Sequence, residues 1–384
     1  MRTDDLDFDL PPELIATAPP DERDAARMLV ASRSDPSAPV RHLLVRDLPE
    51  VLSADDLLVL NRTRVIPARF VGVNEQTGGS VEGLWLADAA DGLAEPWPLR
   101  WRVLLRARRT RPGRTIALLS PDGTPSGVRL ELAEKATGPR SESGAEPASE
   151  PGSWTVVVHD AAGNRPTSAV LEATGRTPLP PYILNARKAE GGVPVDDATD
   201  RARYQTTYAR EGASIAAPTA GLHFTPELLQ RLEARGVGRA ELTLDVGAGT
   251  FRPIETDTVD AHPMHMERCS MDPDALGRVF GGDGKRVIAV GSTSVRTIET
   301  YAAVLARGEA PPASTETDLL ISPGYEWYRV DAIFTNFHLP RSTLIAMIAA
   351  SVEGGIERVR ELYQEAIDHR YRFFSYGDAM LLLP

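Results

Sequence analysis

Apolar strands and helices are predicted to alternate from about residue 161 to the end of the chain. Each apolar run leads into a polar or glycine-containing loop, and most of these loops lead into a helical pattern. Strands separated by helical crossovers are typical of a largely parallel sheet with helices on both faces. The predicted strands are Ala213–Ala217, Arg239–Val246, Arg286–Val290 and Asp331–Phe334, and the predicted helices are Pro226–Arg235, Val295–Leu305 and Ser342–Val352.

Two further strands are predicted near the start of the chain, Arg27–Ser32 and Leu57–Leu60. Between them and the region after residue 161, the pattern of apolar residues changes. Short alternating runs punctuated by Gly, Pro, Asn or Asp predict a small antiparallel barrel or sandwich. We therefore expect an α/β domain from residues 1–69 and 161–384, with a mostly parallel sheet, and an inserted β-barrel domain from residues 70–160. The predicted barrel strands are Phe70–Val73, Val81–Leu86, Trp101–Ala107, Thr115–Leu119, Val128–Leu132 and Trp154–His159.

Composition places the chain among ordinary globular proteins. It has 384 residues, of which 42% are hydrophobic and 25% charged, so it can bury a large core. The acidic start, MRTDDLD, lacks the features of a secretory signal, and the longest apolar runs are too short to cross a bilayer. The single cysteine, Cys269, excludes an internal disulfide. These features predict a cytoplasmic protein with no membrane contact, and we expect a monomer.

Charge argues against nonspecific coating of nucleic acid, because the formal net charge is −12. One segment of this acidic chain is strongly basic: residues 100–114 read RWRVLLRARRTRPGR, with seven arginines and no acid. This segment is either a solvated strand pair or a surface that contacts phosphates, with Trp97 or Trp101 available for stacking. Local binding of nucleic acid therefore stays open.

The loops that follow the predicted strands carry the chemistry. In a parallel sheet such loops emerge on one edge, so together they would line one crevice suited to an anionic or polyhydroxylated ligand. The segment GSTS at 291–294, just before a helix, is a ready anion site, although it is neither a P-loop nor a dinucleotide fingerprint. The loop residues are Thr219, Gly221, His223, Gly247, Gly249, Thr250, Arg252, Ser292, Thr293, Ser294, Arg296, Asn336 and His338.

Two further segments hold ionisable side chains. In HPMHME at 262–267, the local ligands are too few for a metal site, so we expect no metal; His265 and Glu267 are either surface groups or a general acid/base pair. In YRFFSYGDAM at 371–380, Asp378 needs a partner or a function because it precedes an apolar tail. A base could stack on Phe374 or Tyr376 in the same segment.

Several blocks of this sequence, in order along almost the whole chain, match one family. They are FDLPPELIA, DLLVLNRTRVIPAR, LPPYI, RYQTTYA, AAPTAGLHFT, VGAGTFRPI, HPMHMER, VGSTSVRTIE, TDLLISPGYE, TNFHLPRSTL and YRFFSYGDAM. The chain resembles the S-adenosylmethionine:tRNA ribosyltransferase-isomerase family of queuosine biosynthesis. The resemblance implies an α/β domain with an inserted β-barrel and no metal or redox cofactor. It also implies an enzyme that moves the ribosyl part of its co-substrate, S-adenosylmethionine, to 7-aminomethyl-7-deazaguanine at the tRNA wobble position. The implied products are epoxyqueuosine-tRNA, adenine and methionine.

Roles for the candidate residues follow from this chemistry. His223 is the first candidate for proton transfer, Glu267 or His265 the second, and Asp378 or His338 would act as partners. The other loop residues would bind S-adenosylmethionine, with Arg252 and Arg296 holding its carboxylate or a tRNA phosphate. The residues expected to contact tRNA are Arg64, Arg106, Arg108 and Arg109.

The sequence also departs from the family pattern. Arg62 stands where a small polar residue is usual, and Asp245 where a His commonly precedes the Val-Gly pair. Either these replacements are tolerated, or the acceptor has changed to a free 7-deazapurine or another small amine. A third reading is a tRNA-binding module that has lost catalysis; the retained polar loops argue against it.

Overall fold

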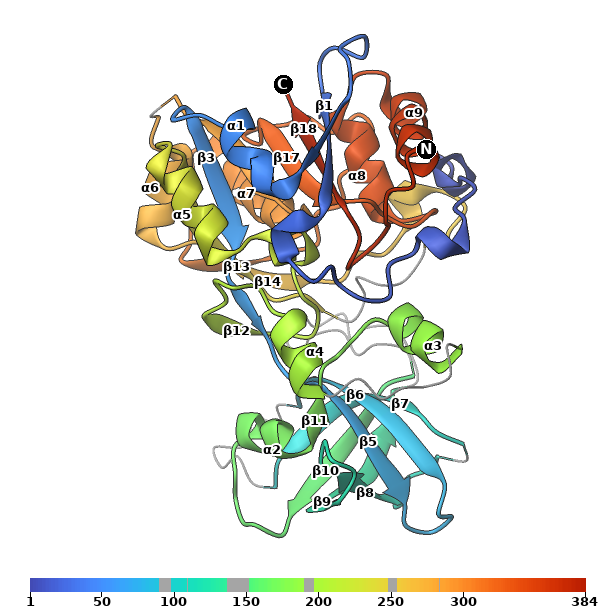
Figure 1. Cartoon of the computed structure of the whole chain (residues 1–384). Coiled ribbons are helices and arrows are strands. Elements are labelled where there is room, and N and C mark those ends of the chain that lie inside the picture. Colours follow the sequence, from blue (N-terminus) through green and yellow to red (C-terminus); the bar gives the residue numbers. More distant parts are fainter. Residues whose placement is uncertain (90–97, 109, 137–151, 190–196, 248–253, 283) are drawn as a thin grey trace. The chain divides into compact units, whose positions relative to one another are not determined.

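The chain forms two compact units in a computed structural model that describes all residues except 90–97, 109, 137–151, 190–196, 248–253 and 283 (Figure 1). The first unit comprises Met1–Arg64, Pro180–Val193 and Arg203–Pro384, and the second comprises Val65–Leu179 and Pro194–Ala202. Within the described residues, no helix combines the length and the apolar content needed to span a bilayer.

A nine-stranded sheet forms the centre of the first unit, in the order β16-β14-β13-β3-β15-β17-β18-β1-β2. The pairings along β13-β3-β15-β17 and between β18 and β1 are parallel. The pairings of β16 with β14, β14 with β13, β17 with β18 and β1 with β2 are antiparallel. The strands are β1 (Arg27–Ser32), β2 (Arg41–Leu44), β3 (Asp56–Asn61), β13 (Gly238–Leu244), β14 (Glu267–Ser270), β15 (Arg286–Val290), β16 (Ser314–Thr317), β17 (Ala332–Asn336) and β18 (Ala379–Leu383).

The sheet is therefore mixed, and the expectation of a mostly parallel sheet is not confirmed. One helical crossover returns the chain to the edge where the strand began, which gives parallel strands. Two helices, α8 (Thr343–Ser351) and α9 (Gly355–Asp368), connect β17 to β18, so the chain re-enters the sheet in the opposite direction. The predicted strand Ala213–Ala217 is also displaced: β12 (Glu211–Ser214) pairs with β4 (Thr63–Val65) in a separate ribbon.

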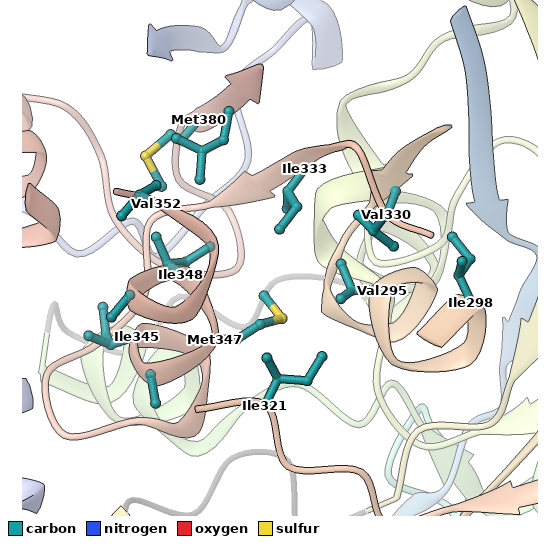
Figure 2. Packing of buried hydrophobic residues seen from close by; sticks show 14 of the residues in the cluster. Val295, Ile298, Ile321, Val330, Ile333, Ile345, Met347, Ile348, Val352 and Met380 are labelled. Carbon is teal, nitrogen blue, oxygen red and sulfur yellow. The ribbon is translucent and has the colours of Figure 1, made fainter. Parts of the chain in front are cut away.

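Helices cover both faces of the sheet, because the middle positions of its central strands are apolar on both faces. In β15, Val287 and Ala289 face one core, and Ile288 and Val290 face the other. The first core includes residues of α6 (Pro273–Phe280), α7 (Ser292–Ala306), α8 and α9, and Figure 2 shows how α7 and α8 pack there. The second core includes residues of α1 (Leu48–Val51), the 3₁₀-helix η5 (Thr219–His223) and α5 (Pro226–Ala234).

The second unit contains a closed antiparallel barrel. Its strands follow the order β5-β6-β7-β10-β9-β8, β5 pairs with β8 to close it, and β11 (Gly175–Arg176) extends it at β5. The unit also holds α2 (Thr167–Thr174); α3 (Pro181–Ala189) belongs to the first unit, and α4 (Asp197–Arg203) spans their boundary. The barrel strands are β5 (Arg69–Asn74), β6 (Ser80–Asp88), β7 (Arg100–Arg106), β8 (Thr115–Leu119), β9 (Pro125–Lys135) and β10 (Trp154–Asp160).

Trp101 lies inside this barrel with no exposed surface. Its indole Nε1 donates a hydrogen bond to Thr167 Oγ1 at 3.0 Å. The side chain is therefore part of the barrel core and is not exposed for stacking on a base, as the sequence had suggested. The alternative residue, Trp97, lies outside the described residues.

Candidate functional site

Two adjacent hollows open beside the first turn of α7 in the first unit. Ser292, Thr293 and Leu344 line both of them. The first hollow also has His265 and Glu267 in its wall, and the second has Asn336 and His338. The loops after β15 and β17 thus meet the strand β14 at one place, and four of the predicted catalytic or binding segments contribute to it.

The start of α7 presents unused hydrogen-bonding groups to this place. Gly291 has φ 82°, a left-handed conformation that glycine adopts without strain, and the helix begins directly after it. The first N–H groups of a helix have no partner within the helix and carry a partial positive charge. The hydroxyls of Thr293 and Ser294 are buried and have no hydrogen-bond partner among the described residues; Thr293 lines both hollows and Ser294 lines neither. Such groups suit a ligand with anionic or hydroxyl oxygens.

Asn336 connects the second hollow to His223. Its amide Nδ2 lies 3.1 Å from His223 Nε2, and both side chains are buried. Its Oδ1 has no partner among the described residues. Asn336 lines the hollow, whereas His223 lies behind it, against the ring of Phe334. Asn336 is therefore the member of the pair that can contact a ligand.

His223 is neutral at physiological pH. Burial lowers its pKa to about 4, and the nearby guanidinium groups of Arg23 and Arg372 act in the same direction. A hydrogen bond with the backbone of Arg23 opposes this shift. Because Nε2 accepts from Asn336, the remaining proton belongs on Nδ1, which fixes the tautomer. The predicted role of His223 in proton transfer stays a prediction, but both of its ring nitrogens are engaged.

His338 lines the second hollow and is also buried. Burial lowers its pKa to about 3, so the ring is neutral at pH 7. Its Nε2 lies 3.0 Å from Thr335 Oγ1, and its backbone N–H donates to the hydroxyl of Tyr363 at 3.0 Å. The contact with Thr335 holds the ring at the wall of the hollow.

Glu267 forms a buried ion pair with Arg296. The Oε2 atom of Glu267 accepts from Arg296 Nη1, and Oε1 accepts from the backbone N–H of Gly247 at 2.9 Å. The other guanidinium nitrogens of Arg296 donate to the carbonyls of Leu319 (3.0 Å) and Thr317 (3.2 Å). Arg296 is thus largely occupied by protein acceptors, and its predicted role in holding a carboxylate or phosphate remains untested.

The remaining predicted residues divide into three groups. His265 is half-buried in the first hollow, and Thr219 lines the second. Gly221 is needed for packing, since a Cβ there would lie 2.1 Å from Tyr208 Oη. The residues Gly249, Thr250, Arg252 and Arg109 lie outside the described residues.

Asp378 connects two segments of the backbone. Its Oδ1 accepts from the backbone N–H of Arg27 at 2.9 Å, and its Oδ2 from that of Arg372 at 2.8 Å. Burial raises the pKa of this carboxyl, and the two backbone hydrogen bonds act against that shift. Asp378 therefore joins β1 to the turn before β18. Of the aromatic residues in this turn, Phe374 lines the second hollow with φ 74°, whereas Tyr376 is buried.

The predicted tRNA-binding arginines are exposed where the structure describes them. Arg106 ends β7 of the barrel and Arg108 follows it, with both side chains in solvent. Arg64 is exposed on β4, in the first unit. Arg106 follows the alternation of β7, which buries Trp101 and Val103 and turns Arg100 and Arg102 outward.

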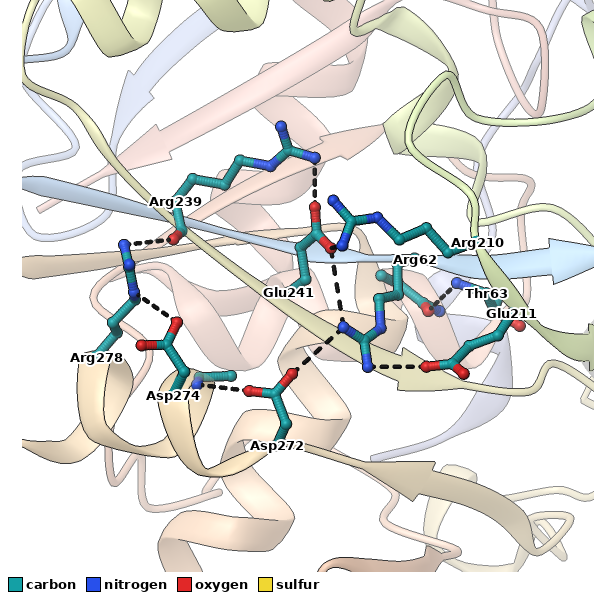
Figure 3. A network of polar contacts seen from close by, with 11 residues as sticks. Arg62, Thr63, Arg210, Glu211, Arg239, Glu241, Asp272, Asp274 and Arg278 are labelled. Carbon is teal, nitrogen blue, oxygen red and sulfur yellow. Dashed lines mark hydrogen bonds and ion pairs between the residues drawn. The ribbon is translucent and has the colours of Figure 1, made fainter.

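Arg62 and Asp245, which depart from the family pattern, line neither hollow. Figure 3 shows Arg62 in a network of charged side chains. Arg62 pairs with Glu211 at 2.9 Å and with Asp272 at 3.3 Å. Asp245 Oδ1 accepts from Thr63 Oγ1 at 2.7 Å and from the backbone N–H of Ala213 at 3.0 Å. No described contact joins Arg62 to Asp245, and each residue has its own partners.

Sequence reasoning missed two residues that complete the site. Thr335 orients His338, and Arg23 contributes the backbone partner and part of the lowered pKa of His223. Thr335 follows the apolar part of β17 and could have been found from its position at the strand end. Arg23 is separated from His223 by 200 residues, so no local signal points to it.

Comparison with known proteins identifies the family of this chain. The family described as "Queuosine biosynthesis protein" matches residues 3–382. The chain belongs to this family. It is 45% identical to the S-adenosylmethionine:tRNA ribosyltransferase-isomerase of Anaeromyxobacter dehalogenans, over 100% of this chain and 99% of the relative. It is 43% identical to the enzyme of the same name from Symbiobacterium thermophilum, over 100% of both chains.

A solved structure also matches this chain. The crystal structure of the S-adenosylmethionine tRNA ribosyltransferase from Thermotoga maritima aligns with 99% of this chain and 100% of its own, with a TM-score of 0.50 and 29% identity. Full-length similarity to several relatives that carry one enzyme name makes this chain an enzyme of the ribosyltransferase-isomerase type.

Proposed function

We propose that the chain transfers and isomerises the ribosyl part of S-adenosylmethionine onto the 7-aminomethyl group of 7-deazaguanine at the tRNA wobble position. The products would be epoxyqueuosine-tRNA, adenine and methionine. The relatives named above support the co-substrate and the tRNA, and the sequence resemblance suggests the base and the products. One observation of this chain carries the proposal. Buried, unpartnered polar atoms of Thr293 and Asn336 belong to residues that line hollows beside the helix start of α7.

The proposed reaction requires several proton transfers at such a site. The sulfonium acidifies the neighbouring 5′ hydrogens of the ribose, so a nearby base can remove one of these protons. Adenine leaves more readily when an acid protonates it, and the acceptor amine must be neutral to attack. His338 and His265 lie in the walls of the hollows, so we propose that they exchange these protons. We propose that Asn336 and Thr293 bind oxygen or nitrogen atoms of the nucleoside.

The acceptor is tested by measuring adenine release from S-adenosylmethionine. The protein is mixed with tRNA that carries the aminomethyl base, with the free base, or with neither. Release that depends on tRNA supports the proposal. Release with the free base alone would indicate a small acceptor instead, and tRNA binding without release would indicate a binding module. Neither Arg62 nor Asp245 lines a hollow, and each is held by protein partners, which supports the interpretation that these replacements are tolerated.

Two threonines of α7 provide a matched pair of variants for the site. Thr293→Val removes the unpartnered hydroxyl beside the hollows, and we expect kcat/KM for S-adenosylmethionine to fall about tenfold, as for the loss of one hydrogen bond worth roughly 1.4 kcal/mol. Thr297→Val removes a hydroxyl that already donates to the carbonyl of Thr293 at 2.9 Å, so kcat/KM should stay near that of the wild type. Equal effects of the two changes would contradict the proposed site.

The tRNA surface is tested separately. Arg106→Ala with Arg108→Ala should weaken tRNA binding and reduce its dependence on salt, because each arginine in contact with a phosphate displaces counterions. The control pair Arg231→Ala and Arg235→Ala removes the same charge from exposed positions at the end of α5. If both pairs change the salt dependence equally, net charge and not the barrel surface is responsible.

A further inference from the structure

A cluster of two histidines and one glutamate lies at the edge of the nine-stranded sheet, outside both hollows. His42 belongs to the edge strand β2, Glu365 lies in the last turn of α9, and His369 caps that helix. Each of these residues offers one ligand atom, and the three atoms lie within 4.8 Å of one another. The sequence alone gave no reason to join His42 to the other two residues. The parallel pairing of β1 with β18 carries β2 to the side of α9.

The geometry of the cluster fits a small divalent metal ion. His42 Nε2 lies 3.1 Å and His369 Nδ1 3.2 Å from the same atom, Glu365 Oε1. When zinc is bound at about 2.0–2.1 Å, tetrahedral ligands are roughly 3.3–3.4 Å apart. Both distances to Glu365 Oε1 are already close to this spacing, and the two histidine nitrogens, which lie within 4.8 Å of each other, would close on the ion by rotation of the exposed His369 ring. Two imidazoles and one carboxylate form a donor set that zinc uses, with a water as the fourth ligand.

The hydroxyl of Tyr371 orients the ring of His42. The other ring nitrogen of His42, Nδ1, lies 2.9 Å from the hydroxyl of Tyr371, whose side chain is fully buried. In the metal-free fold Nε2 of His42 donates its proton to Glu365 Oε1, so metal binding must displace that proton; the remaining proton then sits on Nδ1, with the Tyr371 hydroxyl as its acceptor. His369 Nδ1 also lies 3.0 Å from the carbonyl of Glu365, so metal binding must displace the proton that Nδ1 donates there. Half of the His369 side chain is exposed, which leaves its ring free to adjust.

We propose that His42, Glu365 and His369 form a binding site for Zn²⁺ or a similar borderline divalent ion, which ties β2 to the end of α9. The ion would join an edge strand to the helix that precedes β18. Because a ligand that binds only the folded state stabilises it, bound metal should raise the thermal midpoint of the protein. Hard ions such as Mg²⁺ and Ca²⁺ prefer oxygen ligands and should not bind here.

The test is calorimetric titration of the chelator-treated full chain with ZnCl₂. We expect one equivalent to bind and the melting temperature to rise, with no such effect of MgCl₂. His42→Ala and His369→Ala should each weaken binding at least tenfold and abolish the shift in melting temperature. Tyr371→Phe, which keeps the three ligands but removes the partner of His42, should weaken binding about tenfold. Co²⁺ should give the visible absorption of a tetrahedral site in the wild type and not in His369→Ala.

Two controls separate this site from other metal-binding groups. His159→Ala removes an exposed histidine that is paired with Glu131 on the barrel, and His262→Ala with His265→Ala removes the histidines of the first hollow. Both controls should retain the zinc site. The proposal is overturned if the wild type binds no zinc below millimolar concentration, or if binding survives His42→Ala and disappears with His262 and His265. Circular dichroism of each variant shows whether a lost signal reflects unfolding; for an unfolded alanine variant, His42→Asn and Glu365→Gln replace it.

Discussion

The side-chain amide of Asn336 donates to Nε2 of His223 across 3.1 Å, so that a buried neutral histidine fixes the orientation of a side chain in the wall of a hollow. The contact joins the end of β17 to the 3₁₀-helix η5, which are separated by more than a hundred residues in the sequence. With Nδ2 directed at the histidine, Oδ1 of Asn336 remains as an acceptor without a described partner.

This contact gives the first prediction. His223→Ala should lower kcat by about 10²-fold with a smaller change in KM, as when a group that acts on the transition state is lost. His223→Gln should recover a large part of kcat, because a glutamine oxygen can still accept from Asn336. Steady-state adenine release measures both parameters. If the Gln variant is as slow as the Ala variant, His223 itself transfers a proton.

The second prediction concerns stability in acid. His223 and His338 have pKa values of about 4 and about 3 in the fold, below the ordinary value of 6.5. As the pH falls below 6.5, the unfolded chain takes up these protons and the folded chain does not. The free energy of unfolding should therefore decrease with falling pH, by up to about 1.4 kcal/mol per pH unit for each histidine, until the folded pKa is reached.

Urea unfolding between pH 7 and pH 4.5 measures this slope. His338→Gln removes one of the two groups, so its stability should depend less steeply on pH than that of the wild type. Replacement of the exposed His159 by Gln is the control. Identical slopes in the wild type and in His338→Gln would show that the buried ring does not contribute.

The third prediction concerns the ion pair of Glu267 and Arg296. Arg296→Ala leaves a buried carboxylate with only part of its hydrogen bonds, and we expect a loss of about 3–5 kcal/mol in the free energy of unfolding. Adding Glu267→Gln in the same chain should recover part of this loss, because the uncompensated charge is gone. Urea unfolding of the single and double variants tests the coupling. Arg307→Ala, in the exposed pair with Glu309, should change stability little.

The fourth prediction concerns Asp245 and the identity of the acceptor. Asp245→Ala removes the acceptor shared by Thr63 Oγ1 and the Ala213 N–H, and should cost about 1–3 kcal/mol of stability. Asp245→Asn keeps an oxygen at this position and should cost less. Neither change should alter the preference for tRNA over the free base in the adenine-release assay. A switch of acceptor in either variant would mean that Asp245 selects the substrate.

The predicted elements agree well with the structure where local patterns decide them. All six predicted barrel strands are present, β8 with the predicted bounds. The three predicted helices correspond to α5, α7 and α8. These elements are set by alternation, by helical periodicity and by turn residues, which act over a few positions. The direction of β18 and the position of β12 were not predicted, because strand pairing depends on contacts between distant segments.

The sequence also predicted only part of the candidate site. The sequence indicated that the loops after β15 and β17 carry Thr293, Asn336 and His338, and these residues do line the hollows. It placed His223 first for proton transfer and His338 only as a partner. Whether a histidine lines a hollow, as His338 does, or lies behind an asparagine, as His223 does, depends on the packing of η5 against β17.

The sequence by itself determined the family, the main helices and barrel strands, and the segments that carry the polar side chains of the site. These features depend on which residue types follow one another within a few positions. Only the tertiary structure decided that the sheet is mixed, that Arg296 is bound to Glu267, and that His42 meets Glu365 and His369. Each of these contacts joins parts of the chain that lie far apart in sequence. Such contacts depend on how whole strands and helices pack against one another, and this packing cannot be read from a local sequence pattern.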